Sequence, residues 1–359
     1  MPTPSENAPE LILSSAPHIR AEQSVNMIMW MVVAALTPAA VFSVYTFGLN
    51  ALLVMLTGIL AAALSEGLFQ YLMKKPVTVM DGSAALTGLL LAMNVPPEAP
   101  LWMVGLGSAF AVVIAKQLFG GLGYNIFNPA LAGRAFLMAS WPVYMTTKWH
   151  RFSPANVLSG GVTNAMGMPD AAFDTVTQAT PLGALKEVPK IMTELGISAD
   201  QFYSTLFSDG VMKSLLIGDI GGCVGETSAA LLLLGGFYLL YKRVISWHIP
   251  FTYIGTVAVI MLAYYTATGF PHAVKATLFH LLSGGLMLGA FFMATDMVTS
   301  PVTHRGMIIM GVGCGVITSV IRLYGGYPEG VSYSILLMNA AVPLIDRFTK
   351  PRVFGSTHS

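Results

Sequence analysis

The residues best suited to chemistry stand in one short polar run, which reads Asp-Thr-Val-Thr-Gln-Ala-Thr-Pro-Leu from Asp174 to Leu182. Three threonine hydroxyls and one carboxylate lie within seven residues. Because Pro181 disfavours helix at the residue before it, Thr180 is expected to be extended and its hydroxyl accessible to a modifying enzyme. The structural alternative is a turn or helix N-terminus, since Asp, Thr and Pro are common there as well.

A second set of candidates is polar residues set in apolar stretches. Charge inside hydrocarbon is costly, so an ionisable residue there is a functional candidate. Arg134 and Glu226 lie well inside such stretches, where either a function or a structural ion pair would explain them. Glu226 and Asp296, with neighbouring carbonyl oxygens, form a possible pathway for sodium ions or protons, and the sequence does not distinguish the two.

The composition shows what kind of protein must position these residues. Of 359 residues, 55% are hydrophobic and only 10% are charged, whereas soluble domains carry about 25% charge. The chain is therefore expected to be an all-α polytopic membrane protein. A net charge of +1 argues against nucleic-acid binding. Cys223 and Cys314 are too few for an iron–sulfur cluster, which needs four thiolates, so both are expected to be buried as small apolar residues.

Apolar segments of helical length predict about ten transmembrane helices. They cover residues 26–47, 50–73, 80–95, 100–119, 126–146, 219–240, 247–268, 273–294, 305–324 and 331–347. The third and fifth contain Gly, Pro or Asn and are expected to be broken or partly re-entrant.

The Lys and Arg residues predict the orientation of these helices. In a ten-helix arrangement they cluster at one side, which is cytoplasmic by the positive-inside rule, while the short loops of the other side have none. The prediction is a cytoplasmic N-terminal segment (1–24), five helices (25–147), an outer, periplasmic loop (148–218), five more helices (219–348) and a cytoplasmic tail (349–359). Thr180 then lies on the periplasmic side.

One stretch recurs in form. Residues 113–121, Val-Ile-Ala-Lys-Gln-Leu-Phe-Gly-Gly, are followed 205 residues later by 318–326, Thr-Ser-Val-Ile-Arg-Leu-Tyr-Gly-Gly. The two double glycines fall on opposite sides of the predicted membrane. This indicates two inverted five-helix repeats, with a site expected near the midplane where they meet.

The polar run resembles the acceptor site of bacterial flavin transferases, Asp-x-x-Thr-x-Ala-Thr-Pro-Leu. Further blocks, residues 128–136, 225–228, 293–296, 327–331, 336–339 and 343–346, are similar to those of the D subunit of the Rnf complex, the ion-pumping ferredoxin:NAD oxidoreductase. The B subunit of the sodium-pumping NADH:quinone reductase is a close relative, but the longer N-terminal extension typical of it is lacking. Gln178 departs from the acceptor pattern, where glycine is commoner.

The resemblance implies covalent FMN on Thr180 through a phosphoester, with Asp174, Thr177 and Ala179 read by the flavin transferase. It also implies a fold similar to urea transporters and, as a further possible cofactor, a non-covalent riboflavin near the cytoplasmic side. Arg134, Asn125, Asn128 and Glu226 are candidates for the flavin environment, where Arg134 or the amides of Asn125 and Asn128 would stabilise a reduced flavin.

The resemblance further implies a multi-pass protein of the bacterial inner membrane, with both termini cytoplasmic. Its partners would be the A, B, C, E and G subunits of the Rnf complex, the flavin transferase and the lipid bilayer. No Gly-x-Gly-x-x-Gly unit follows a strand, so other subunits would bind NAD and ferredoxin, and this chain would hold no complete active site. Two alternatives stay open: the B subunit of a sodium-pumping NADH:quinone reductase, and a solute transporter or channel without redox activity.

Overall fold

The computed structural model describes residues 24–146, 181–186, 199–218, 221–326 and 330–350. Those residues form helices and connecting turns, without a β-strand. Residues 174–180, which contain the predicted acceptor and the part read by the transferase, lie outside the described residues, as do Asp219 and both ends of the chain.

Among the described residues, the first half of the chain contains six α-helices and two other helical segments. They are α1 (Val25–Phe47), α2 (Leu49–Leu72), the 3-10 turn η1 (Val79–Asp81), α3 (Ser83–Met93), α4 (Leu101–Val112), the π-helix η2 (Val113–Gln117), α5 (Pro129–Ser140) and α6 (Pro142–Thr146). A short helix, α9 (Pro181–Lys186), and the pair α11 (Ala199–Leu206) and α12 (Asp209–Ile217) follow.

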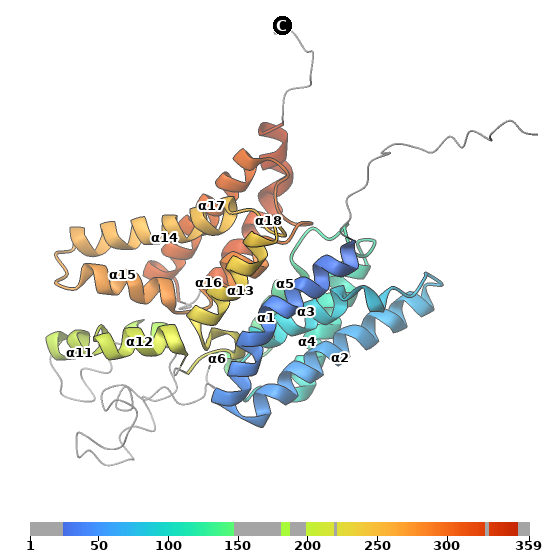
Figure 1. Cartoon of the computed structure of the whole chain (residues 1–359), viewed down its shortest axis with the longest axis horizontal. Helices are drawn as coiled ribbons and strands as arrows, with labels where there is room; N and C mark the ends of the chain where they lie inside the picture. The colour runs from blue at the N-terminus through green and yellow to red at the C-terminus, as the bar shows by residue number, and fades with distance from the viewer. Residues whose placement is uncertain (1–23, 147–180, 187–198, 219–220, 327–329, 351–359) are drawn as a thin grey trace, which may run out of the picture.

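The second half begins at the 3-10 turn η3 (Val224–Glu226). It continues with α13 (Ala229–Tyr241), α14 (His248–Ala267), α15 (Ala273–Leu282), α16 (Leu286–Leu288), the π-helix η4 (Gly289–Met293), α17 (His304–Tyr324) and α18 (Val331–Phe348). Figure 1 shows the two groups side by side, blue to green and yellow to red.

The helix starts follow from local chemistry. The hydroxyls of Ser24, Ser228 and Thr303 accept hydrogen bonds from the backbone N–H groups of the first turns of α1, α13 and α17. Asn128 does the same for α5, and Pro129 follows at the first helical position, where its missing N–H costs nothing.

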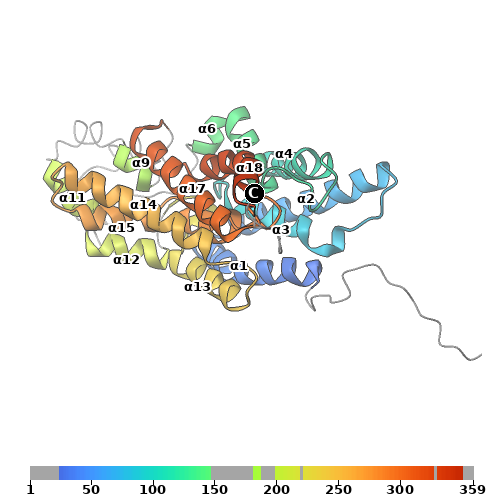
Figure 2. The same ribbon diagram turned by 90° about the horizontal axis from the view of Figure 1, so that it is seen from above.

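The same packing scheme occurs in both halves. Helix α2 packs on α3 and α4, and α14 packs on α15 and α17. Helices α1 and α13 join the halves and lie side by side in both views (Figures 1 and 2). Glycines allow the close approach: a β-carbon at Gly235 of α13 would lie 2.3 Å from the carbonyl oxygen of Ala35 in α1. Small residues at helix contacts are typical of membrane proteins.

Within the described residues, four helices are long and apolar enough to cross a membrane: α1, α2, α14 and α17. The bent pair Ala273–Leu282 and Leu286–Met293 makes a fifth if it is one span, and α3, the α4–η2 segment and α13 are shorter apolar helices. The helical segments follow the predicted apolar ranges, but ten spans remain a prediction. The 59° bend lies in the eighth predicted segment, at Ser283-Gly284-Gly285, and the sequence analysis did not predict it.

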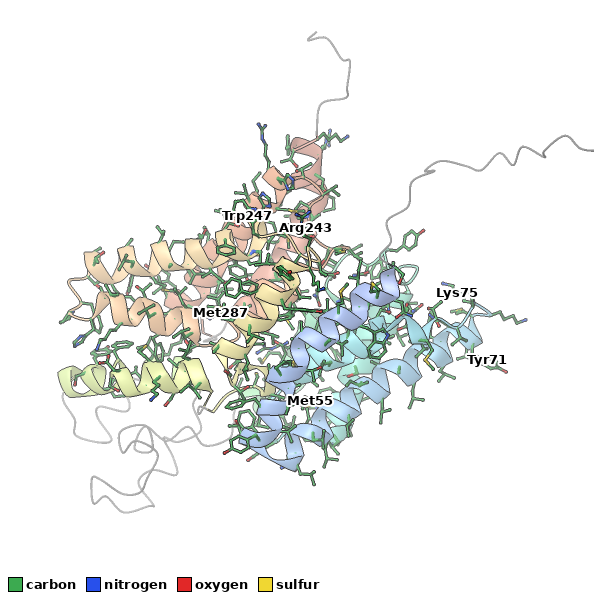
Figure 3. The ribbon with its side chains drawn as sticks, in the orientation of Figure 1. Met55, Tyr71, Lys75, Arg243, Trp247 and Met287 are labelled. Carbon is green, nitrogen blue, oxygen red and sulfur yellow. The ribbon has the colours of Figure 1, made fainter. Side chains whose placement is uncertain are left out.

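Figure 3 shows two of the basic residues that indicated orientation, Lys75 just after α2 at the right and Arg243 just after α13 at the upper centre, whereas Met55 in α2 lies lower down. Figure 1 places the turn between α1 and α2 at the opposite, lower end.

Candidate functional site

The anchor of the predicted acceptor is helix α9, which begins one residue after Thr180. Leu182 is 2% exposed and packs with Phe279 of α15 and with Phe202 and Phe207 from the α11 and α12 region. Lys186 donates hydrogen bonds to the carbonyl oxygens of Ile321 and Gly325 at the end of α17. Figure 2 shows α9 beside α17. The position of the residue after Thr180 is thereby fixed against the second half of the chain.

Beneath α9 lies the break between α15 and α16, Ser283-Gly284-Gly285. Both glycines have a left-handed backbone (φ +69° and +65°), which glycine adopts without strain. The buried Arg322 of α17 donates to the carbonyl oxygens of His280, Ser283 and Gly284, which the helix end leaves without helical partners. A β-carbon at Gly284 would clash with Leu182, so α9 rests directly on this break.

The two positive groups at this place affect each other. Burial, together with the neighbouring Arg322 guanidinium, lowers the pKa of the Lys186 ammonium group. Arg322 carries its own charge among backbone carbonyl oxygens. Two cationic side chains therefore lie close together next to the predicted flavin anchor.

Glu226 lies on the other side of the same break. A β-carbon at Gly285 would lie 3.1 Å from its Oε1, and one at Gly222 would lie 2.8 Å from its Oε2. The residue is half-buried in η3. The carboxylate thus lies against the unwound backbone of two glycine turns.

A polar junction at the centre of the protein joins the two halves; it consists of Asn94, Asn128, Arg134, Cys223, Met293, Ser332 and Asn339. Arg134 is 4% exposed and donates to Asn94 Oδ1 (2.8 Å) and Ser332 Oγ (3.0 Å), with Cys223 Sγ at 3.9 Å. These partners come from the end of α3, from α18 and from the turn before η3. The guanidinium therefore ties the first half of the chain to the second.

Asn128 makes the second connection in the polar junction. Its backbone N–H donates to Asn339 Oδ1 (3.2 Å), and its side-chain amide donates to the carbonyl oxygen of Met293 (3.2 Å). Asn339 in turn donates to the carbonyl oxygen of Thr299 (2.9 Å). Each bond joins groups far apart in sequence, so Asn128 caps α5 and fixes it to η4 and α18 together.

A small cavity of about 90 Å³ adjoins the polar junction between α1, α3, α5 and η4. Asn125, Asn128 and Asp296 line it, with Ser83 and Lys116. The Oδ1 of Asn125 is buried and has no hydrogen-bond partner among the described residues. Asp296 accepts bonds from the Val298 N–H and the Thr299 hydroxyl.

The structure thus brings some of the candidate residues from the sequence together and leaves others apart. Asn125, Asn128 and Asp296 line one cavity, and Arg134 lies less than two helical turns after Asn128 on α5. Glu226 lines no part of that cavity and faces the glycine break instead. Cys223 and Cys314 are buried, as expected, and form no disulfide among the described residues. No group of three metal-binding side chains occurs among the residues whose positions are described.

One buried network was missed by the sequence reasoning. Lys116 Nζ lies 2.9 and 2.8 Å from the two carboxylate oxygens of Glu66 and 2.6 Å from Ser83 Oγ. Glu66 also accepts from Gln117 (2.8 Å) and Gln70 (3.2 Å). Lys116 is in the recurring stretch 113–121, but nothing in the spacing of a lone glutamate 50 residues earlier identifies its partner.

Comparison with known proteins places the chain in a family. The family model described as NQR2, RnfD, RnfE matches residues 12–355. The D subunit of the proton-translocating ferredoxin:NAD(+) oxidoreductase complex of Clostridium ljungdahlii is 50% identical over 349 residues, 96% of each chain. The D subunit of the Na(+)-translocating ferredoxin:NAD(+) oxidoreductase complex of Acetobacterium woodii is 47% identical over 98% of this chain and 97% of its own.

A more distant relative gives the same assignment. The D subunit of the ion-translocating oxidoreductase complex of Escherichia coli is 38% identical over 362 residues, which cover 96% of this chain and 98% of the relative. The family model covers nearly the whole chain, and so does the similarity to proteins named as D subunits. The chain therefore belongs to the NQR2, RnfD, RnfE family.

Proposed function

We propose that this chain is the membrane-embedded electron-transfer subunit of an Rnf-type complex and carries FMN covalently on Thr180. The observation that carries the proposal is the full-length similarity to proteins named as D subunits of ferredoxin:NAD(+) oxidoreductase complexes. The acceptor-like run from Asp174 to Leu182 adds a place for the cofactor. A quinone-reductase subunit or a solute channel is a poorer account, because neither explains both features.

The described residues next to Thr180 support such an attachment. Leu182 is buried and Lys186 is bonded to the end of α17, so a group on Thr180 would be tethered at a fixed point instead of on a free loop. Asp174, Thr177 and Ala179 would be read by the flavin transferase, and the phosphoester leaves the ring of the flavin free. Bound FMN would supply the exchange between paired and single electrons.

The chain's own part in this function is electrostatic and positional. Lys186 and Arg322 put two positive groups beside the anchor, which favours a phosphate and a reduced flavin there. Arg134 lies deeper, in the polar junction, and Asn94 and Ser332 fix its orientation. Thr180 serves as an anchor and needs no acid–base role.

The second flavin expected from the resemblance does not fit the cavity lined by Asn125, Asn128 and Asp296. Its volume is about 90 Å³, whereas sites for molecules of that size occupy about 300 Å³ or more. The space suits a few water molecules, which the unpartnered Asn125 Oδ1 would bond. No step of the proposed function uses a riboflavin at that place.

For the coupled ion, the proposal assigns Glu226 and Asp296 to the pathway. Both are carboxylates next to unwound backbone, as ion sites at broken membrane helices require. The relatives from Clostridium ljungdahlii and Acetobacterium woodii are named for different ions, a proton and Na(+), at 50% and 47% identity. Overall similarity therefore does not decide the ion, and sodium dependence must be measured directly.

The proposed setting is the bacterial inner membrane, with the flavin loop periplasmic and both termini cytoplasmic. The partners would be the A, B, C, E and G subunits of the Rnf complex, and the subunits other than this one would bind NAD and ferredoxin. The one-sided basic residues, among them Lys75 and Arg243, support that orientation (Figure 3).

The test is intact-mass analysis of the protein after co-expression with an active flavin transferase, followed by peptide mapping of residues 148–218. The expected result is an added mass of FMN minus water on the peptide containing Thr180, and its loss in Thr180→Val. Thr175→Val, in the same run, is the matched control and should keep the flavin. An unmodified wild-type chain, or flavin retained on Thr180→Val, would refute the attachment site.

A further inference from the structure

A second cavity lies at the basic side of the second half and plays no part in the function above. It has a volume of about 950 Å³ and lies between the end of α13, the start of α14 and the connection from η4 to α17. Arg243, Trp247, His248 and His304 contribute to its wall. Figure 3 shows Trp247 and Arg243 close together there.

The depth of this cavity matches the surface of a membrane. Helix α14 is one of the four helices long and apolar enough to cross a bilayer, and the cavity surrounds its first residue, His248. Trp247, just before it, is 55% exposed, and tryptophan concentrates at the level of the lipid head groups. The cavity therefore opens where water and hydrocarbon meet.

The wall of the cavity has an apolar part and a polar part, as the binding of an amphiphilic molecule requires. Phe251, Met297 and Val302 line it and are 49%, 54% and 82% exposed, which gives an apolar surface for hydrocarbon. Ser246 and Ser300 provide hydroxyl groups on the same wall. A molecule with a polar head and apolar chains would match both parts.

The charge of the wall selects the head group. Arg243, His248 and His304 are the ionisable residues that line the cavity, and Lys242 and Arg305 adjoin them in sequence. Two carboxylates lie near this wall: Asp346, which accepts from the Val302 N–H, and Asp296, which accepts from Val298 and Thr299. The permanent positive charges of Lys242, Arg243 and Arg305 outnumber them. A negative head group is therefore favoured over a zwitterionic one.

Three aromatic rings hold these groups in place. The rings of Trp247 and His248 stack at 4.2 Å, and those of His248 and His304 stack at 4.4 Å. His248 Nδ1 is buried and has no hydrogen-bond partner in the described parts of the chain. Arg243 takes a left-handed backbone (φ 56°), a conformation rare for residues other than glycine. The stacking fixes the His248 and His304 rings on the same wall as Arg243.

We propose that this cavity is a binding site for an anionic phospholipid. The phosphate lies against Arg243 and the His248–His304 pair, and the acyl chains extend along Phe251 and Met297. Trp247 packs at the level of the glycerol. The occupant is a bilayer lipid rather than a free phosphate, because the apolar wall is continuous with the membrane-facing surface of α14.

The test uses the whole complex in phosphatidylcholine vesicles that contain about one lipid in ten as phosphatidylglycerol. Either lipid is supplied with brominated acyl chains, which quench tryptophan fluorescence on contact. The signal of Trp247 is the difference between the wild type and Trp247→Phe. We expect brominated phosphatidylglycerol to quench this signal roughly fivefold more efficiently per molecule than brominated phosphatidylcholine, the ratio that one basic contact gives.

Two variants make the result specific. Arg243→Gln combined with His304→Gln should lower the phosphatidylglycerol preference to about that of phosphatidylcholine. Lys75→Gln, on the same side of the membrane but distant from the cavity, should leave the preference unchanged (Figure 3). Added inorganic phosphate should not compete.

Five results would overturn the proposal. Equal quenching by both lipids in the wild type would show no selectivity, and an equal loss in Lys75→Gln would show general surface attraction. Competition by inorganic phosphate would show an anion site without lipid. Trp247 unquenched by both lipids would show that another subunit covers the cavity, and a flavin lost from the Arg243 variant would show that a flavin occupies it.

Discussion

Breaking the buried pair of Glu66 and Lys116 is the sharpest test of how the first half is held together. Both side chains are at most 2% exposed, and Lys116 contacts both carboxylate oxygens within 2.9 Å. Removing one member of a buried pair leaves the other charge unpaired and costs about 3–5 kcal/mol. Glu66→Gln leaves Lys116 with the Ser83 hydroxyl, and Lys116→Met leaves Glu66 with Gln70 and Gln117.

The double variant should be far less damaging than the two single variants added together. With Glu66→Gln and Lys116→Met combined, no charge is buried and the amide at position 66 keeps Gln70 and Gln117 as partners. We expect each single variant to lower the apparent unfolding temperature of the purified protein by on the order of 5–15 °C. The double variant should recover at least half of the larger loss.

The assay is thermal unfolding in detergent, followed by the amount of protein that stays monodisperse after heating. Gln117→Leu is a control that removes one neutral donor to the same carboxylate and should cost about 1–3 kcal/mol. If the double variant loses as much as the sum of the single variants, the two charges do not depend on each other and the reasoning fails.

Three further predictions use the same measurement or a simple protease assay. Gly235→Val should separate α1 from α13, because a β-carbon at Gly235 lies 2.3 Å from the Ala35 carbonyl oxygen. The unfolding temperature should fall by several degrees. Gly255→Ala is the control and should leave the unfolding temperature unchanged, because Gly255 has open space around it. Arg134→Met should cost about 1–3 kcal/mol by leaving Asn94 Oδ1 without its donor, and a wild-type unfolding temperature would contradict the assigned bonds. Lys186→Met should speed chymotrypsin cleavage at Leu182 and Leu185, because α9 loses its bonds to the end of α17. Lys213→Met, on the exposed face of α12, is the control. Equal cleavage rates in the two variants would contradict the anchoring of α9 by Lys186.

Much of the helical layout could be predicted from sequence because length and apolarity decide it. The predicted segments 26–47, 50–73 and 305–324 agree with α1, α2 and α17 to within a few residues. The bend at Ser283-Gly284-Gly285 was missed, since paired glycines are also common at straight, closely packed helix contacts. Arg322 allows the helix to break at this glycine pair. It lies on a helix about 40 residues further along the chain and donates hydrogen bonds to the carbonyl oxygens that the break leaves free.

The candidate residues were only partly predictable for a similar reason. Asn128 and Arg134 were recognised because polar groups in apolar surroundings are costly, and both are buried and bonded. Their partners, Asn94, Ser332 and Asn339, come from distant helices, and spacing along the chain does not encode that proximity. The Glu66–Lys116 pair depends in the same way on how α2 and η2 meet.

The two π-helices have a consequence for how this chain tolerates insertions and deletions. In η2 the N–H of Leu118 bonds to the carbonyl oxygen of Val113, and in η4 that of Ala294 bonds to Gly289, so each turn holds one residue more than an α-helical turn. A one-residue deletion in either would restore a regular α-helical turn and leave the residues beyond it nearly in phase, because the widened turn holds one residue more. In η2 the narrower turn would take one of the neighbouring donors, Lys116 and Gln117, away from Glu66; in η4 it would shift the Met293 carbonyl oxygen that accepts from Asn128. The extra residue in each π-helix therefore serves a contact, and its deletion should cost stability without moving the helix beyond it.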